Sequence, residues 1–152
     1  MLYHTVNIAL IDRHPVFRTG MRVLLKRQFD NITTLETGSM QSFKKVAPQE
    51  PVDIIIIGLS EEQPEIDRVA LKRMMRKNPV ASFIVYASKP GYELAKSLMR
   101  IGVKGCLTKN SRPDELVTCV NAVISGEPYL CPQIQTLVPE KNKRVTEKRK
   151  LA

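Results

Sequence analysis

Few residues in this sequence have the types and spacing that catalysis or metal binding requires. The two histidines, His4 and His14, form no recognisable pattern with a serine or cysteine, and we expect surface or capping roles for both. The three cysteines, Cys106, Cys119 and Cys131, match neither a zinc motif nor a disulfide framework, and this is typical of reduced intracellular thiols. The sequence therefore predicts a protein that is not an enzyme.

A run of four isoleucines marks the centre of the expected fold. Residues 54–57 follow Asp53 and precede Gly58, and β-branched residues without polar alternation are typical of a strand buried on both faces. Loops at the carboxyl ends of such parallel strands form the ligand crevice. We therefore expect Gly58, Leu59 and Ser60 to face the functional site.

Strand and helix patterns alternate along the chain. Five segments are predicted as strands, and each is followed by a helical pattern: residues 6–11, 32–37, 52–58, 83–87 and 106–108. With right-handed crossovers, this alternation indicates a flavodoxin-like, doubly wound α/β fold, with a five-stranded parallel sheet in the order 2-1-3-4-5 flanked by five helices. No glycine-rich phosphate loop follows the first strand, so nucleotide binding is not indicated.

The helix predicted after the isoleucine strand has one apolar face and one basic face. Ile66, Val69, Ala70 and Met74 are expected on its inner face. A basic outer face, which we expect to be exposed to solvent, is formed by Arg68, Lys72, Arg73 and Arg76.

Four stretches occur in an order and spacing that carry a family resemblance: residues 12–21, 53–58, 101–111 and 126–130. The first contains the pattern His-Pro-x-x-Arg-x-Gly, and the third contains Gly-x-x-Gly-x-Leu-x-Lys. Together they resemble the receiver domain of response regulators of the NarL/FixJ (LuxR-type) family, over roughly residues 5–135. The resemblance implies a CheY-like fold and a part in two-component phosphorelay signal transduction and transcription regulation.

The resemblance also implies a phosphorylation site, which this sequence keeps only in part. In the family, three carboxylates at the strand ends hold a magnesium ion beside the aspartate that accepts phosphate. Asp12 matches the first acidic position, but Arg13 stands at the second and Gly58 at the phosphoacceptor. Because a guanidinium stays charged, we expect Arg13 to pair with Asp12 and to oppose cation binding. No cofactor, and in particular no magnesium, is therefore expected.

The family's switch positions have changed as well. Ala87 stands where the family has a serine or threonine, although Ser88 is next to it, and Cys106 takes the place of the switch aromatic. Lys109, which in the family pairs with the phosphoryl group, is retained. Without a phosphoacceptor, we expect Lys109 to form an ion pair with Asp12 across the strand ends.

A displaced phosphoacceptor is one alternative. Glu61 and Glu62 lie just beyond Gly58, in a loop near the expected site. In-line phosphoryl transfer depends on a tightly positioned nucleophile and metal, which argues against this alternative.

The end of the chain is basic. From residue 137 onward six Lys and Arg residues oppose two Glu, a net charge of +4 out of +9 for the whole chain. Residues 145–151 resemble the opening of the helix-turn-helix domain that follows the receiver in this family. We therefore predict a receiver domain over residues 1–130 and a basic linker or tail over residues 131–152. This tail either begins a truncated helix-turn-helix domain or is an ordinary flexible terminus.

These observations support one main hypothesis and two alternatives. The main hypothesis is a degenerate, pseudo-receiver domain of a DNA-binding regulator, which acts by protein–protein contact without phosphorylation at the usual aspartate position. The alternatives are a phosphorelay receiver with a shifted acceptor, and a stand-alone adaptor that binds a protein or a small ligand.

The expected partners follow from the main hypothesis. We expect a homodimer through a surface that includes the fifth helix, with Glu115, Thr118 and Asn121 at its rim, and a histidine kinase or another regulator protein as partner. DNA would be contacted only through a missing C-terminal domain. No signal pattern or membrane span is present in the sequence, so a cytoplasmic protein without membrane contact is expected.

Overall fold

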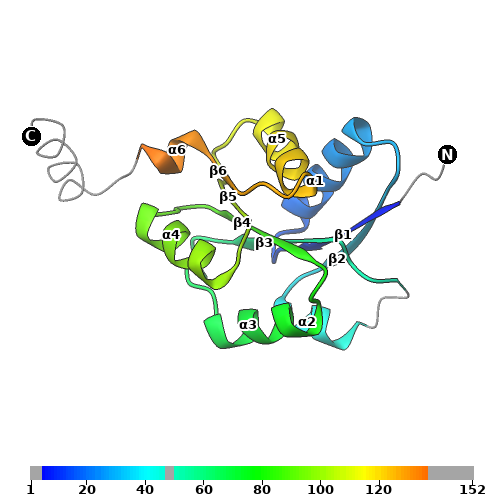
Figure 1. The fold of residues 1–152 in the computed structure, drawn as a ribbon, viewed down its shortest axis with the longest axis horizontal. Helices are drawn as coiled ribbons and strands as arrows, with labels where there is room; N and C mark the ends of the chain where they lie inside the picture. The colour runs from blue at the N-terminus through cyan, green and yellow to red at the C-terminus, as the bar shows by residue number, and fades with distance from the viewer. Residues whose placement is uncertain (1–4, 47–49, 137–152) are drawn as a thin grey trace, which may run out of the picture.

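The computed structural model describes residues 5–46 and 50–136 and shows a parallel sheet covered by helices on both faces (Figure 1). His4 and the tail residues 145–151 lie outside the described residues. The strands, in chain order, are β1 (Val6–Ile11), β2 (Ile32–Thr37), β3 (Ile54–Leu59), β4 (Ser82–Ala87), β5 (Gly105–Thr108) and β6 (Tyr129–Leu130). Their spatial order is β2-β1-β3-β4-β5-β6, which confirms the predicted flavodoxin-like fold and strand order.

The isoleucine run forms the centre of the sheet, as the sequence predicts. β3 lies between β1 and β4, and Ile54, Ile55, Ile56 and Ile57 are each at most 2% exposed. Full burial of one such side chain contributes about 1.5–3 kcal/mol, measured against an extended unfolded chain. This burial stabilises β3, and β3 ends at the same edge of the sheet as its neighbours β1 and β4.

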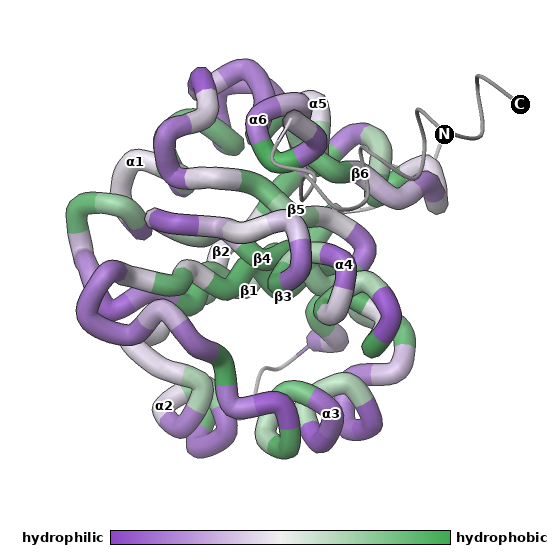
Figure 2. Tube along the Cα trace, turned by 90° about the vertical axis from the view of Figure 1, so that its left-hand side faces the viewer, coloured by the Kyte–Doolittle hydropathy of each residue, from purple (hydrophilic) through white to green (hydrophobic). Residues whose placement is uncertain are grey.

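The helices divide between the two faces of the sheet. In Figure 1, α1 and α5 lie above the sheet and α2 and α3 below it, and Figure 2 shows the hydrophobic strands between these layers. Among the described residues, no helix has the length and apolar character needed to cross a membrane. The helices are α1 (Pro15–Gln28), α2 (Met40–Lys45), α3 (Arg68–Lys77), α4 (Tyr92–Ile101), α5 (Pro113–Ile124) and α6 (Pro132–Gln135).

The inner face of α3 differs in part from the predicted one. Leu71 and Met74 are buried, whereas Val69 is 65% exposed, so the placement of Val69 on the inner face was wrong. At 3.6 residues per turn, residues two apart point to nearly opposite sides of a helix, and Val69 therefore faces away from Leu71. The basic outer face is confirmed, since its four Lys and Arg side chains are exposed.

The folded body continues past residue 130, where the sequence predicted the start of a tail. β6 pairs in parallel with β5 and adds a sixth strand to the five that were predicted. Cys131, just before α6, and Ile134, on α6, are fully buried. The sequence missed these elements because a strand of two residues followed by a single helical turn has no measurable periodicity.

Candidate functional site

The ends of four neighbouring strands bring together residues that lie far apart in the sequence. Asp12 follows β1, Gly58 lies near the end of β3, Ala87 ends β4 and Lys109 follows β5. Parallel pairing places these strand ends at the same edge of the sheet. The structure thus gathers four of the positions singled out in the sequence.

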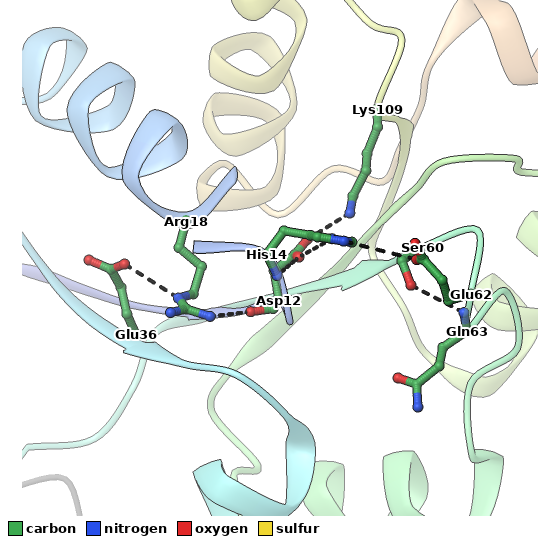
Figure 3. A network of polar contacts seen from close by, with 8 residues as sticks. All are labelled: Asp12, His14, Arg18, Glu36, Ser60, Glu62, Gln63 and Lys109. Carbon is green, nitrogen blue, oxygen red and sulfur yellow. Dashed lines mark hydrogen bonds and ion pairs between the residues drawn. The ribbon is translucent and has the colours of Figure 1, made fainter. Parts of the chain in front are cut away.

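Asp12 and Lys109 form a buried ion pair at this edge. The Lys109 Nζ lies 2.8 Å from Asp12 Oδ2, with the lysine side chain 4% and the aspartate side chain 1% exposed. The contact is electrostatic, because its angles fall short of a directed hydrogen bond. The other carboxylate oxygen, Oδ1, accepts a hydrogen bond from the backbone N–H of His14 at 2.8 Å (Figure 3). The predicted pairing of Lys109 with Asp12 is confirmed.

Two aromatic rings enclose the Lys109 ammonium group. The Nζ lies 4.2 Å from the centre of the Phe17 ring and 6.0 Å from that of Tyr86. The face of an aromatic ring attracts a cation, so both rings help to hold the ammonium group in place. Burial, and secondarily the Asp12 carboxylate, raise the pKa of Tyr86. Sequence reasoning missed both rings, although Tyr86 lies directly before Ala87.

A second polar cluster joins β1 to β2 through α1. Arg18 donates a hydrogen bond to the main-chain oxygen of Asp12, and its Nε lies 3.6 Å from a Glu36 carboxylate oxygen (Figure 3). Arg22 pairs with the same carboxylate. Arg18 is the arginine of the His-Pro-x-x-Arg-x-Gly pattern, so its position was visible in the sequence while its contacts were not.

Arg13 does not pair with Asp12, and that prediction was wrong. The Arg13 side chain is exposed, and none of the ion pairs between described residues involves it. Arg13 lies in the bend that follows β1, and its guanidinium stays in water, whereas pairing with the buried Asp12 would require burying it as well. Within the described part of the chain, the buried cation that pairs with Asp12 is Lys109.

Gly58 has no room for a side chain. A Cβ atom at this position would lie 1.9 Å from Asp12 Oδ2 and 2.7 Å from Asp12 Cγ, far inside van der Waals contact. The Asp12 carboxylate therefore occupies the space in which a residue at position 58 would begin its side chain. A side chain at position 58 would therefore displace the Asp12 carboxylate from its place beside Lys109.

The loop after β3 places its two carboxylates at the surface. Glu61 Oε1 lies 3.9 Å from the Lys89 ammonium, and Glu62 Oε2 lies 3.9 Å from His14 Nε2. Hydrogen bonds with its own backbone and with Ser60 hold the pKa of Glu62 below its usual value. His14 occupies the N-cap position of α1 but makes no side-chain capping bond, and its Nδ1 lies 3.4 Å from Asp12 Oδ1.

No hydrogen bond or ion pair between described residues joins Ser88 or Cys106 to the Asp12–Lys109 pair. The backbone N–H of Ser88 donates to the Leu59 carbonyl at 3.0 Å. Cys106 is buried within β5, and its Sγ lies 3.9 Å from the Ala95 carbonyl of α4. Burial raises the pKa of the Cys106 thiol to about 12. All three cysteines are free and buried, as expected for thiols that pack as small apolar groups.

The residues at this edge do not fit a magnesium ion. Magnesium takes several hard oxygen ligands in near-octahedral geometry. Both oxygens of Asp12 are already engaged by His14 and Lys109, and the positions of Arg13 and Gly58 offer no side-chain oxygen. Within residues 5–46 and 50–136, no three histidine, cysteine or acidic side chains form a group that could hold a metal ion.

Known proteins resemble this chain over most of its length. It is 30% identical over 129 residues to the transcriptional regulatory protein UhpA of Escherichia coli, covering 85% of this chain and 64% of UhpA. It is 26% identical over 133 residues to the oxygen regulatory protein NreC of Staphylococcus carnosus, covering 86% of this chain and 60% of NreC. The chain thus spans about three fifths of the length of these relatives.

Solved structures and a family model agree with the fold. The isolated receiver domain of RcsB from Salmonella enterica superposes with a TM-score of 0.77 at 18% identity, covering 90% of this chain and all of that domain. The family model described as the response regulator receiver domain matches residues 8–121. On this match, and with the strand order and strand-end site described above, the chain belongs to the response regulator receiver domain family.

Proposed function

We propose that this chain is the receiver domain of a transcription regulator that acts through protein–protein contacts, without phosphorylation at the usual aspartate position. The observation that carries the proposal is the place of the Asp12 carboxylate, 1.9 Å from where a Cβ at position 58 would stand. Lys109, which in the family meets the phosphoryl group, is neutralised by this same carboxylate. The site is thus closed by an internal ion pair.

A receiver without a phosphoryl switch can still regulate. A partner shifts a conformational equilibrium only through its different affinity for the two states. A histidine kinase or another regulator protein that prefers one conformation of this domain would supply that difference. Contact with DNA would belong to the part of the regulator that relatives such as UhpA have beyond the length matched by this chain.

Treatment with acetyl phosphate and magnesium tests the proposal. We expect no saturable magnesium binding at millimolar concentration by calorimetry, and no mass shift after borohydride trapping, because one engaged carboxylate cannot hold the ion. A receiver domain with its three carboxylates intact serves as positive control. Saturable magnesium binding that is lost in Asp12→Asn would contradict the proposal. A trapped product that is lost in Glu61→Gln or Glu62→Gln would establish the shifted-acceptor alternative instead.

Dimerisation is the second part of the proposal, and the α1–α5 side of the molecule favours it. The other candidate dimer surface is the face formed by α4, β5 and α5. α6 packs beside α4 and against β5 and so covers part of that face. On the α1–α5 side, Val16 is 81%, Val23 45% and Ile124 49% exposed. RcsB, a structural neighbour, has been solved as dimers bound to DNA. We infer a phosphorylation-independent homodimer through this side.

Two of the three predicted rim residues fit this surface. Thr118 and Asn121 are exposed on α5. Glu115 is half-buried and accepts a hydrogen bond from Gln133 Nε2 at 2.9 Å, so its assignment as an exposed rim position was wrong. The cause is α6, which the sequence did not reveal and whose Gln133 contacts the Glu115 carboxylate.

Sedimentation across a wide concentration range measures the dimer. We expect a weak monomer–dimer equilibrium that acetyl phosphate leaves unchanged, and that Ile124→Lys shifts toward monomer because it places a charge in an apolar contact. Val69→Lys is the matched control, since Val69 is equally apolar and 65% exposed but lies on α3, on the opposite face. A strict monomer, dimerisation only with the phosphate donor, or equal effects of the two variants would contradict this assignment.

A further inference from the structure

A cleft of about 920 Å³ opens between α2 and α3, below the strand-end edge. Its size falls within the range of small-molecule sites, about 300–1,000 Å³. The space arises because α2 is only six residues long and α3 does not begin until Arg68, well after β3 ends at Leu59. The two helices therefore stand apart over the carboxyl-terminal half of β3.

The inner wall of the cleft is apolar. Ile57 and Leu59, two residues apart on β3, point to the same side of the sheet and line the cleft floor. Phe43 of α2 and Met74 of α3 line the two side walls. These side chains belong to the core, so an apolar group that enters the cleft would extend the core and exclude water.

The mouth of the cleft is basic on both sides. Lys44 enters from α2, and Arg73 and Lys77 enter from α3; all three are exposed and take part in no ion pair between described residues. A cation in the last turn of a helix is favoured by the helix dipole, which accounts for Lys44 and Lys77. Arg73 lies in the middle of α3, where the dipole gives no such reason.

The acidic groups at the cleft are already engaged or few. Asp12 is paired with Lys109, and Asp67 caps α3 by accepting a hydrogen bond from the Ala70 N–H at 3.0 Å. Asp67 keeps its negative charge, and Glu65 is the other acidic residue that lines the cleft without an ion pair between described residues. Against these two carboxylates the lining has four cations: Arg13, Lys44, Arg73 and Lys77. The unpaired charge around the apolar interior is therefore predominantly positive.

We propose that this cleft binds a small organic anion with an apolar body, such as a medium-chain or aromatic carboxylate, with its head group at Arg73, Lys77 and Lys44. The apolar body would lie against Val46, which is 36% exposed, and the half-buried Met40, since Ile57 and Leu59 on the floor are at most 6% exposed. Because the cleft also reaches Gly58 and Ser60, a bound ligand would contact the edge at which receiver domains are switched. This inference stands independently of the proposed absence of phosphorylation, since the cleft lies beside the Asp12–Lys109 pair and does not require it to be closed.

Three probes separate the contributions of charge and apolar body. Decanoate, kept below its micelle-forming concentration, is compared with decyltrimethylammonium, which has the same chain and the opposite charge, and with butyrate, which has little apolar body. Binding to the full chain is followed by calorimetry and by backbone amide shifts of Leu59, Ser60 and Ala70. We expect saturable binding of decanoate only, with the largest shifts at these cleft residues.

Charge reversal in α3 provides the matched control. Arg73→Glu should weaken decanoate binding about tenfold, because it removes an attraction and adds a repulsion. Arg76→Glu makes the same change on the same helix, at an exposed residue that does not line the cleft, and should leave binding unchanged. The proposal is overturned if no probe binds saturably, if the cationic probe binds as well as decanoate, or if the two variants weaken binding equally.

Discussion

Replacing Lys109 by methionine is expected to lower the free energy of unfolding by about 3–5 kcal/mol, because it leaves a buried aspartate without its counter-charge. Asp12 is 1% exposed, so water cannot take the place of the ammonium without opening the strand-end edge. Methionine keeps most of the apolar stem of lysine, so the loss reports the charge and not the packing. Urea unfolding, followed by circular dichroism, measures the change.

Two further variants show whether loss of the Asp12–Lys109 ion pair causes the loss of stability in Lys109→Met. Lys104→Met makes the same replacement at an exposed lysine just before β5 and should change stability by less than about 0.5 kcal/mol. Adding Asp12→Asn to Lys109→Met removes the stranded charge and should recover a large part of the loss, since a buried pair replaced as a whole is often nearly neutral. Equal stabilities for the Lys109 and Lys104 variants would mean that the ion pair is not buried in solution.

The main features of the fold were predictable because each depends on local patterns that add up along the chain. Four β-branched residues in a row predict a strand buried on both faces, and β3 is such a strand. Right-handed crossovers then leave few alternatives for the strand order. β6 and α6 escaped prediction because their stability comes from packing of Cys131 and Ile134 against β5 and α4, which a single sequence does not display.

The site was predictable as a set of positions and less so as a set of contacts. The pairing of Asp12 with Lys109 follows from where two strands end, which the sequence pattern indicates. Arg13 does not join them because it lies in the bend after β1, where its guanidinium stays in water and avoids the cost of burial. Phe17 and Tyr86 come from different elements, so their meeting around Lys109 depends on tertiary structure alone.

Gly58→Ala is expected to destabilise the protein by about 1–3 kcal/mol, the usual cost of overpacking, although alanine generally stabilises regular structure relative to glycine. The added methyl group would meet Asp12 Oδ2 at 1.9 Å, so the carboxylate must turn away from Lys109 or the strands must separate. Gly20→Ala in α1 is the matched control. A Cβ at Gly20 meets nothing within 4 Å, and this variant should gain roughly 0.5–1 kcal/mol.

The same clash predicts the effect of placing an aspartate, the family's phosphoacceptor, at position 58. Gly58→Asp should be at least as unstable as Gly58→Ala, because it adds a second carboxylate beside Asp12 at a position with one buried cation. It should also remain unlabelled by acetyl phosphate and magnesium, since displacement of Asp12 leaves no oxygen cluster to hold the ion. In an Asp12→Ala background, Gly58→Ala should cost less than in the natural sequence, because the carboxylate that it meets is gone. If the two costs are equal, or if Gly58→Asp alone accepts phosphate, Asp12 does not occupy the acceptor position in solution and the site is open.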